Sequence, residues 1–139
     1  MTETTGRMLW TMRILSAIAL LAAGGIHLYL VFNGVGGILG VMFVLNAIAA
    51  LALAIGMLVL HGRLLQLATV LSLLFLIATL LSLLLALSPI GLFGIHETWD
   101  FMLVPETVIV ESIGIVVLAI TTVLVLRKPV GQPTMRRGI

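Results

Sequence analysis

Three polar side chains that could bind a proton, a metal ion or a small molecule lie inside long apolar segments of the sequence: His27, Asn46 and Glu111. Glu111 comes six residues after Pro105, which is about 9 Å along a helix. A carboxyl group at that depth in a lipid bilayer must be protonated, paired or hydrated, and ionisable groups in such places usually serve a function. Glu111 is therefore the leading candidate for a ligand or proton site. The alternative is a protonated side chain that fixes helix packing.

His27 and Asn46 are the second and third candidates. His27 lies five residues before Phe32, so it reaches a depth of about 8 Å, similar to that of Glu111. A hydrogen bond between His27 and Glu111 would orient the imidazole, as a carboxylate orients a metal-bound histidine. Asn46 lies about 12 Å deep by the same helical rise. Either residue could instead serve only to join helices.

A further group of polar residues follows the third apolar run. His96 and Asp100 are four residues apart, so they would approach each other if this stretch is helical. Together with His27 and Glu111, they could ligate a transition metal. The alternative is a solvated acidic loop. We predict a polar pocket with Asn46 at its base. The aromatic residues of the segment 90–104 should cover its opening.

The elements that must position these residues are four apolar runs, each long enough to cross a bilayer as a helix. The sequence is 62% hydrophobic and 9% charged, which excludes an ordinary water-soluble domain. We predict one bundle over residues 1–128 and a flexible, basic cytoplasmic tail over 129–139. The expected spans are 14–32, 38–60, 64–87 and 105–126.

The basic residues predict the orientation of these spans. All seven lie before the first run, between the second and third, or after the fourth: Arg7, Arg13, Arg63, Arg127, Lys128, Arg136 and Arg137. Basic residues next to spans stay on the cytoplasmic side. We therefore expect an all-α, up-down-up-down four-helix bundle with both termini in the cytoplasm. Because this pattern accounts for the positive charge, we do not expect a nucleic-acid partner.

Helical spacing predicts which faces of the spans point inward. In the first span Ser16, Ala23 and His27 share a face, and Gly24 permits a close helix approach. The fourth span has a small and polar stripe, which should face its neighbours: Thr107, Glu111, Gly114 and Thr121 or Thr122. Its opposite face should contact lipid: Ile109, Ile113 and Val116.

Four short pieces of the sequence carry a resemblance to a known group: His27-Leu-Tyr-Leu, the stretch Gly40 to Asn46, the stretch Leu92 to Asp100, and Val110-Glu111. They resemble small four-span integral membrane proteins of high-GC Gram-positive bacteria, a group without a known reaction. The resemblance covers most of the membrane part. It implies a location in the bacterial plasma membrane.

These observations favour a membrane binding protein or an accessory subunit whose pocket holds a transition metal or a quinone-like lipid. Its expected partners are the bilayer, other membrane subunits or a second copy. Two alternatives are a small proton-coupled transporter that uses Glu111 and a purely structural subunit. Haem is less favoured, because only His27 lies within a span. The sequence has no cysteine and no recognisable catalytic motif, so it favours a protein that is not an enzyme and leaves that question open.

Overall fold

The predicted all-α bundle is confirmed by a computed structural model, which describes residues 2–34, 36–91 and 103–127. Four helices make up almost all of these residues, and the described ranges contain no strand. The helices are α1 (Thr2–Phe32), α2 (Gly37–Val59), α3 (Gly62–Leu87) and α4 (Val104–Arg127). All four are long and apolar enough to cross a membrane. The expected tail 129–139 lies outside the described residues.

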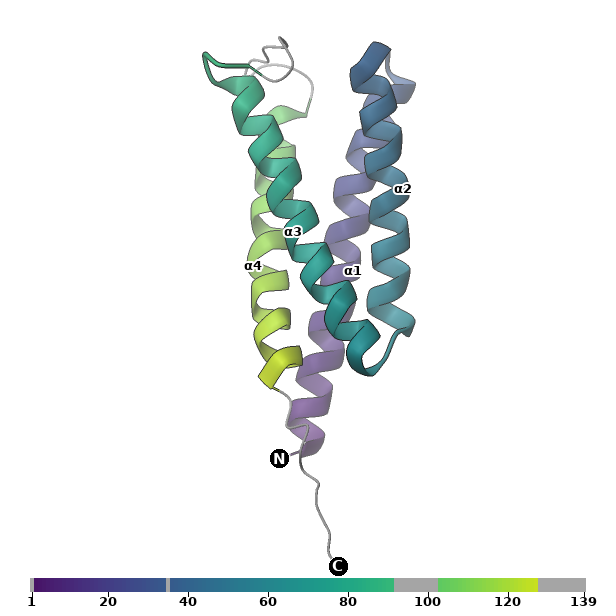
Figure 1. The fold of residues 1–139 in the computed structure, drawn as a ribbon, viewed down its shortest axis with the longest axis vertical. Coiled ribbons are helices and arrows are strands. Elements are labelled where there is room, and N and C mark those ends of the chain that lie inside the picture. Colours follow the sequence, from purple (N-terminus) through teal and green to yellow (C-terminus); the bar gives the residue numbers. More distant parts are fainter. Residues whose placement is uncertain (1, 35, 92–102, 128–139) are drawn as a thin grey trace, which may run out of the picture.

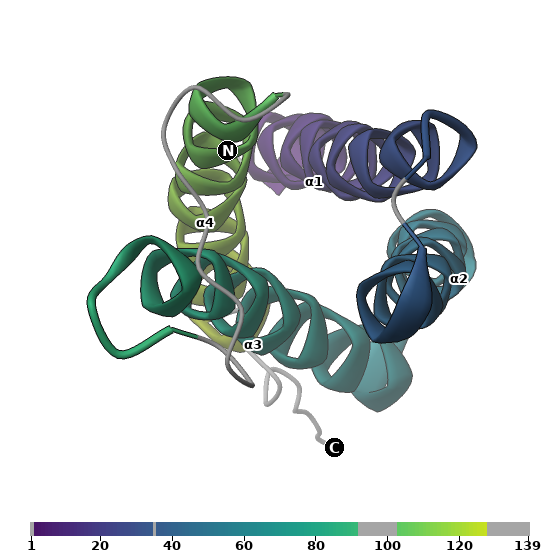
Figure 2. The ribbon, with the colours of Figure 1, turned by 90° about the horizontal axis from the view of Figure 1, so that it is seen from above.

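Consecutive helices run in opposite directions (Figure 1), as expected from the short connections for α1 and α2 and for α2 and α3. Seen along the bundle, the helices form a square in which α1 lies between α2 and α4, and α3 closes the fourth side (Figure 2). Among the four pairs of neighbouring helices, packing is most extensive between α1 and α2 and least extensive between α2 and α3. α2 and α3 also diverge with distance from the short turn that joins them (Figure 1).

The largest difference from the expected boundaries is at the start of α1. This helix begins at Thr2 rather than near Ile14, because no proline interrupts the preceding residues and two of them pack against the bundle. Leu9 and Arg13 are both buried. At the other end of the molecule Pro105 and Glu106 occupy the first turn of α4, where proline needs no amide partner and a carboxylate suits the helix dipole.

The interior combines apolar side chains with small residues that bring helices close together. Leu20, Met57, Leu76 and Leu118 are fully buried, one from each helix. At Gly24 a Cβ atom would stand 2.7 Å from the Cβ of Ala50. Glycine is therefore required at this crossing of α1 and α2, as the sequence predicted.

The outer surface of the bundle is apolar. Ile109, Ile113 and Val116 are each 57–59% exposed, as predicted for a lipid-facing side of α4. The predicted inward stripe is also confirmed, because Thr107, Glu111, Gly114 and Thr121 are buried, whereas Thr122 is half-buried. A protein with four such helices is a multi-pass membrane protein.

Candidate functional site

Glu111 lies in the interior of the bundle, where its side chain is 0% exposed. α4 runs antiparallel to α3, and a Cβ atom at Gly114 would stand 2.7 Å from Leu76. One turn further toward the start of α4, Glu111 faces Thr79, whose hydroxyl is near the carboxylate. Neither carboxylate oxygen has a hydrogen-bond partner within the described part of the chain. A buried acid without a hydrogen-bond partner is costly, so its presence in the interior requires an explanation.

Asn46 contributes a second unpartnered oxygen. Its Oδ1 atom is buried and accepts no hydrogen bond from any described residue. Asn46 is on the face of α2 that also carries the buried residues Ala50 and Met57, so it points into the bundle.

The register of the helices brings Asn46 to the level of Glu111. Near the turn between α2 and α3, Gly56 lies against Ala68, and the Thr69 hydroxyl is 3.6 Å from the Met57 sulfur. Because the two helices are antiparallel, 10 or 11 residues along each lead from these contacts to Asn46 and Thr79. Asn46, Thr79 and Glu111, from three different helices, therefore lie at about the same level along the bundle, and we call these three residues the polar layer.

His27 is buried on α1, but it makes different contacts from those predicted. Its Nδ1 lies 2.7 Å from the main-chain oxygen of Ala23, and because a carbonyl only accepts, Nδ1 carries a hydrogen. The ring also meets Phe43 of α2 edge to face, with centroids 4.8 Å apart. The predicted hydrogen bond to Glu111 is absent, since the Glu111 oxygens have no partner among the described residues. The carbonyl one turn earlier in the same helix takes the imidazole hydrogen instead.

The predicted transition-metal ligands are only partly within the described structure. His96 and Asp100 lie outside it, as does most of the segment expected to cover the pocket. In the ranges 2–34, 36–91 and 103–127, no three His, Cys, Asp or Glu side chains are grouped to hold a metal ion. A set with His27, Glu111, His96 and Asp100 therefore stays a prediction.

Three further polar residues have roles that the sequence did not reveal. Arg13, which the sequence indicated only as one of the basic residues that predict orientation, is buried and hydrogen-bonds to the last turn of α2. The Thr79 hydroxyl donates to the Leu76 carbonyl at 3.0 Å, which leaves its oxygen lone pairs for the polar layer. The buried Ser72 hydroxyl lacks a partner among the described residues. The only indication of these roles is that each residue shares a helix face with buried positions.

The four apolar helices define the class of this chain as a multi-pass integral membrane protein. Comparisons with protein-family models, curated proteins and solved structures found no match. The resemblance to four-span proteins of high-GC Gram-positive bacteria therefore stays a prediction.

Proposed function

We propose that this protein binds a small ligand in the polar interior of its membrane bundle, either alone or as an accessory subunit of a larger complex. The observation that carries the proposal is the fully buried carboxylate of Glu111, whose two oxygens have no hydrogen-bond partner among the described residues. An unpaired acid inside a membrane protein is expensive, and such residues usually mark a binding or transport path.

The atoms that lack partners indicate what the ligand must supply. Asn46 Oδ1 and the two Glu111 oxygens are hydrogen-bond acceptors, and Ser72 Oγ can accept as well. The ligand should therefore supply hydrogen-bond donors or positive charge, as a quinol hydroxyl or a metal ion would. The Nε2 atom of His27 is a further candidate contact, because Nδ1 is already bound to Ala23. A backbone-bound Nδ1 is the usual arrangement for a histidine that uses Nε2 as a ligand.

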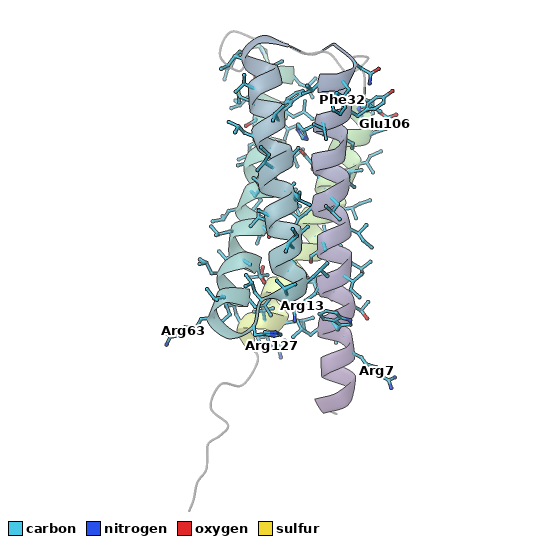
Figure 3. All side chains as sticks on the ribbon, turned by 90° about the vertical axis from the view of Figure 1, so that its right-hand side faces the viewer. Arg7, Arg13, Phe32, Arg63, Glu106 and Arg127 are labelled. Carbon is cyan, nitrogen blue, oxygen red and sulfur yellow. The ribbon has the colours of Figure 1, made fainter. Side chains whose placement is uncertain are left out.

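The distribution of charge supports one orientation of this site. Arg7, Arg13, Arg63 and Arg127 lie at one end of the bundle, and Glu106 lies at the other (Figure 3). We propose that the arginine end faces the cytoplasm, which would place the polar layer in the outer half of the membrane. The resemblance adds the bacterial plasma membrane as the proposed location.

Native mass spectrometry of gently extracted protein, with metal analysis of the same sample, tests the proposal. A bound ion or molecule should be present in the wild type and lost in Glu111→Gln. Ser82→Ala is the control, because that exposed hydroxyl bonds only to Ala78 of its own helix in the described structure. A wild type without any ligand, or with other polypeptides alone, would instead indicate a structural subunit.

A second candidate is proton-coupled transport, which the complete burial of Glu111 also favours. A membrane-embedded carboxyl that exchanges a proton for a substrate is a common element of such carriers. Reconstituted liposomes separate the two functions. Substrate uptake that requires both a pH gradient and Glu111 would establish transport, whereas tight binding without uptake would leave the binding function.

A further inference from the structure

We propose that the polar layer formed by Asn46, Thr79 and Glu111 is a binding site for a monovalent metal cation, with Na⁺ as the reference ion. The inference rests on the proposed function, because it assigns a ligand class to the same interior. It differs from the transition-metal set predicted from the sequence. That set uses histidine and residues outside the described structure, whereas this one uses oxygen atoms from three described helices.

The donor atoms are those that hard cations prefer. A carboxylate, an amide carbonyl and a hydroxyl are all oxygen ligands, which suit alkali and alkaline-earth cations better than transition metals. Three of the oxygens, Asn46 Oδ1 and both Glu111 carboxylate oxygens, are buried and have no partner in the described structure. The Thr79 hydroxyl donates its hydrogen to Leu76, so its oxygen can still accept a further contact.

The charge of the layer selects a monovalent ion. Glu111 is the only acidic side chain buried in the described structure, and one carboxylate balances one positive charge. A divalent ion would leave a net positive charge inside an apolar bundle, where uncompensated charge is costly. The buried cationic side chain, Arg13, hydrogen-bonds to the end of α2 and lies at the arginine end of the bundle, away from this layer (Figure 3).

The helices contribute to the site by their packing. α3 and α4 are held in register where Gly114 meets Leu76, and this register sets Thr79 beside Glu111. Of the four neighbouring helix pairs, α2 and α3 pack least, and α2 and α4 lie on opposite sides of the square (Figure 2). A cation shared by Asn46 and Glu111 would therefore join α2 to α4 through the interior of the bundle. Cation binding should stabilise the folded protein, because it adds a link that direct contacts between α2 and α3 do not provide.

The test is a thermal unfolding series of the purified protein in detergent, in NaCl and in N-methyl-D-glucamine chloride at equal ionic strength, together with binding of radioactive Na⁺. We expect Na⁺ to raise the melting temperature of the wild type in a saturable manner. Glu111→Gln and Asn46→Leu should each weaken Na⁺ binding by about tenfold or more, since a lost contact to a charged ligand corresponds to roughly that factor.

Two threonines of α3 provide a matched control. Thr79 and Thr69 both donate to a carbonyl of their own helix, but Thr69 contacts Met57 near the other end of the bundle. Thr79→Val should weaken Na⁺ binding, whereas Thr69→Val should leave it unchanged. This pair keeps the test valid even if the Glu111 variant does not fold.

Three results would overturn the cation site. The first is a wild type that melts at the same temperature in the chlorides of Na⁺, K⁺, Li⁺ and N-methyl-D-glucamine. The second is Na⁺ binding that Glu111→Gln and Thr79→Val do not affect, and the third is equal loss in Thr69→Val and Thr79→Val. If mass spectrometry then found an organic ligand that is lost in Glu111→Gln, the proposed binding function would hold and the cation site would be excluded. A protein that binds neither would reject both.

Discussion

The Nε atom of Arg13 lies 2.7 Å from the main-chain oxygen of Met57, so a side chain of α1 binds the end of α2. The same guanidinium donates to the Leu60 carbonyl at 2.8 Å and lies 4.9 Å from the centroid of the Trp10 ring. The last carbonyls of a helix have no partner within that helix and carry partial negative charge. Arg13 thus satisfies backbone groups and fixes α1 against the end of α2.

Replacing Arg13 should therefore destabilise the bundle. We expect Arg13→Met to lower the free energy of unfolding by about 2–4 kcal/mol, because two hydrogen bonds from a charged donor are lost and buried carbonyls are left unpaired. Arg63→Gln, at an exposed arginine of the same end, should change stability by less than about 0.5 kcal/mol. Unfolding of both variants in mixed micelles of rising SDS fraction measures the difference. Equal effects would show that net charge, not the α2 contact, matters.

Two adjacent glycines of α1 should respond in opposite ways to alanine. Gly24→Ala sets a Cβ atom 2.7 Å from the Cβ of Ala50, so α1 and α2 must move apart, at a cost of about 1–3 kcal/mol. At Gly25 nothing lies within 4 Å of the added atom. Gly25→Ala should be neutral or stabilise the helix by up to about 1 kcal/mol. The same unfolding assay decides the point, and a similar loss in both variants would contradict the close approach.

Glu111 should reduce the stability of the unliganded protein. Both of its carboxylate oxygens are buried without a partner in the described structure, so a side chain of similar length without polar atoms removes a penalty of about 1–3 kcal/mol. We expect Glu111→Met to melt at a higher temperature than the wild type in N-methyl-D-glucamine chloride. A lower melting temperature would instead identify Glu111 as a residue that stabilises helix packing.

The absence of cysteine allows a direct test of orientation. Single cysteines introduced as His61→Cys, just before the start of α3, and Glu106→Cys, in the first turn of α4, lie at exposed positions. Arg63, two residues after His61, and Glu106 lie at opposite ends of the bundle (Figure 3). If the arginine end is cytoplasmic, a membrane-impermeant maleimide applied to intact cells should label Glu106→Cys alone. His61→Cys should react only after the membrane is opened. The reverse pattern would contradict the proposed topology.

Much of the fold follows from features that the sequence displays locally. The apolar runs predict four helices, and the two short connections make α1 and α2, and α2 and α3, antiparallel. Helical spacing assigns Ile109 and Ile113 to the outer face of α4. The helix α1 begins before the expected span, because hydropathy marks where a lipid-compatible segment begins and not where a helix begins. Leu9 and Arg13 continue the helix by packing on the bundle, which no local pattern reveals.

The candidate site likewise combines features that the sequence predicts with contacts that depend on helix packing. The sequence by itself indicated that His27, Asn46 and Glu111 enter the bundle and roughly how deep, because each lies a countable number of residues from the end of an apolar run. Only the tertiary structure decided their partners: His27 bonds to Ala23 and meets Phe43, Thr79 faces Glu111, and Arg13 binds the end of α2. Such pairings depend on the register and rotation of packed helices. In an apolar chain the register and rotation of the helices are set by close contacts such as those at Gly24 and Gly114. These contacts contribute to stability only when the helices are packed side by side.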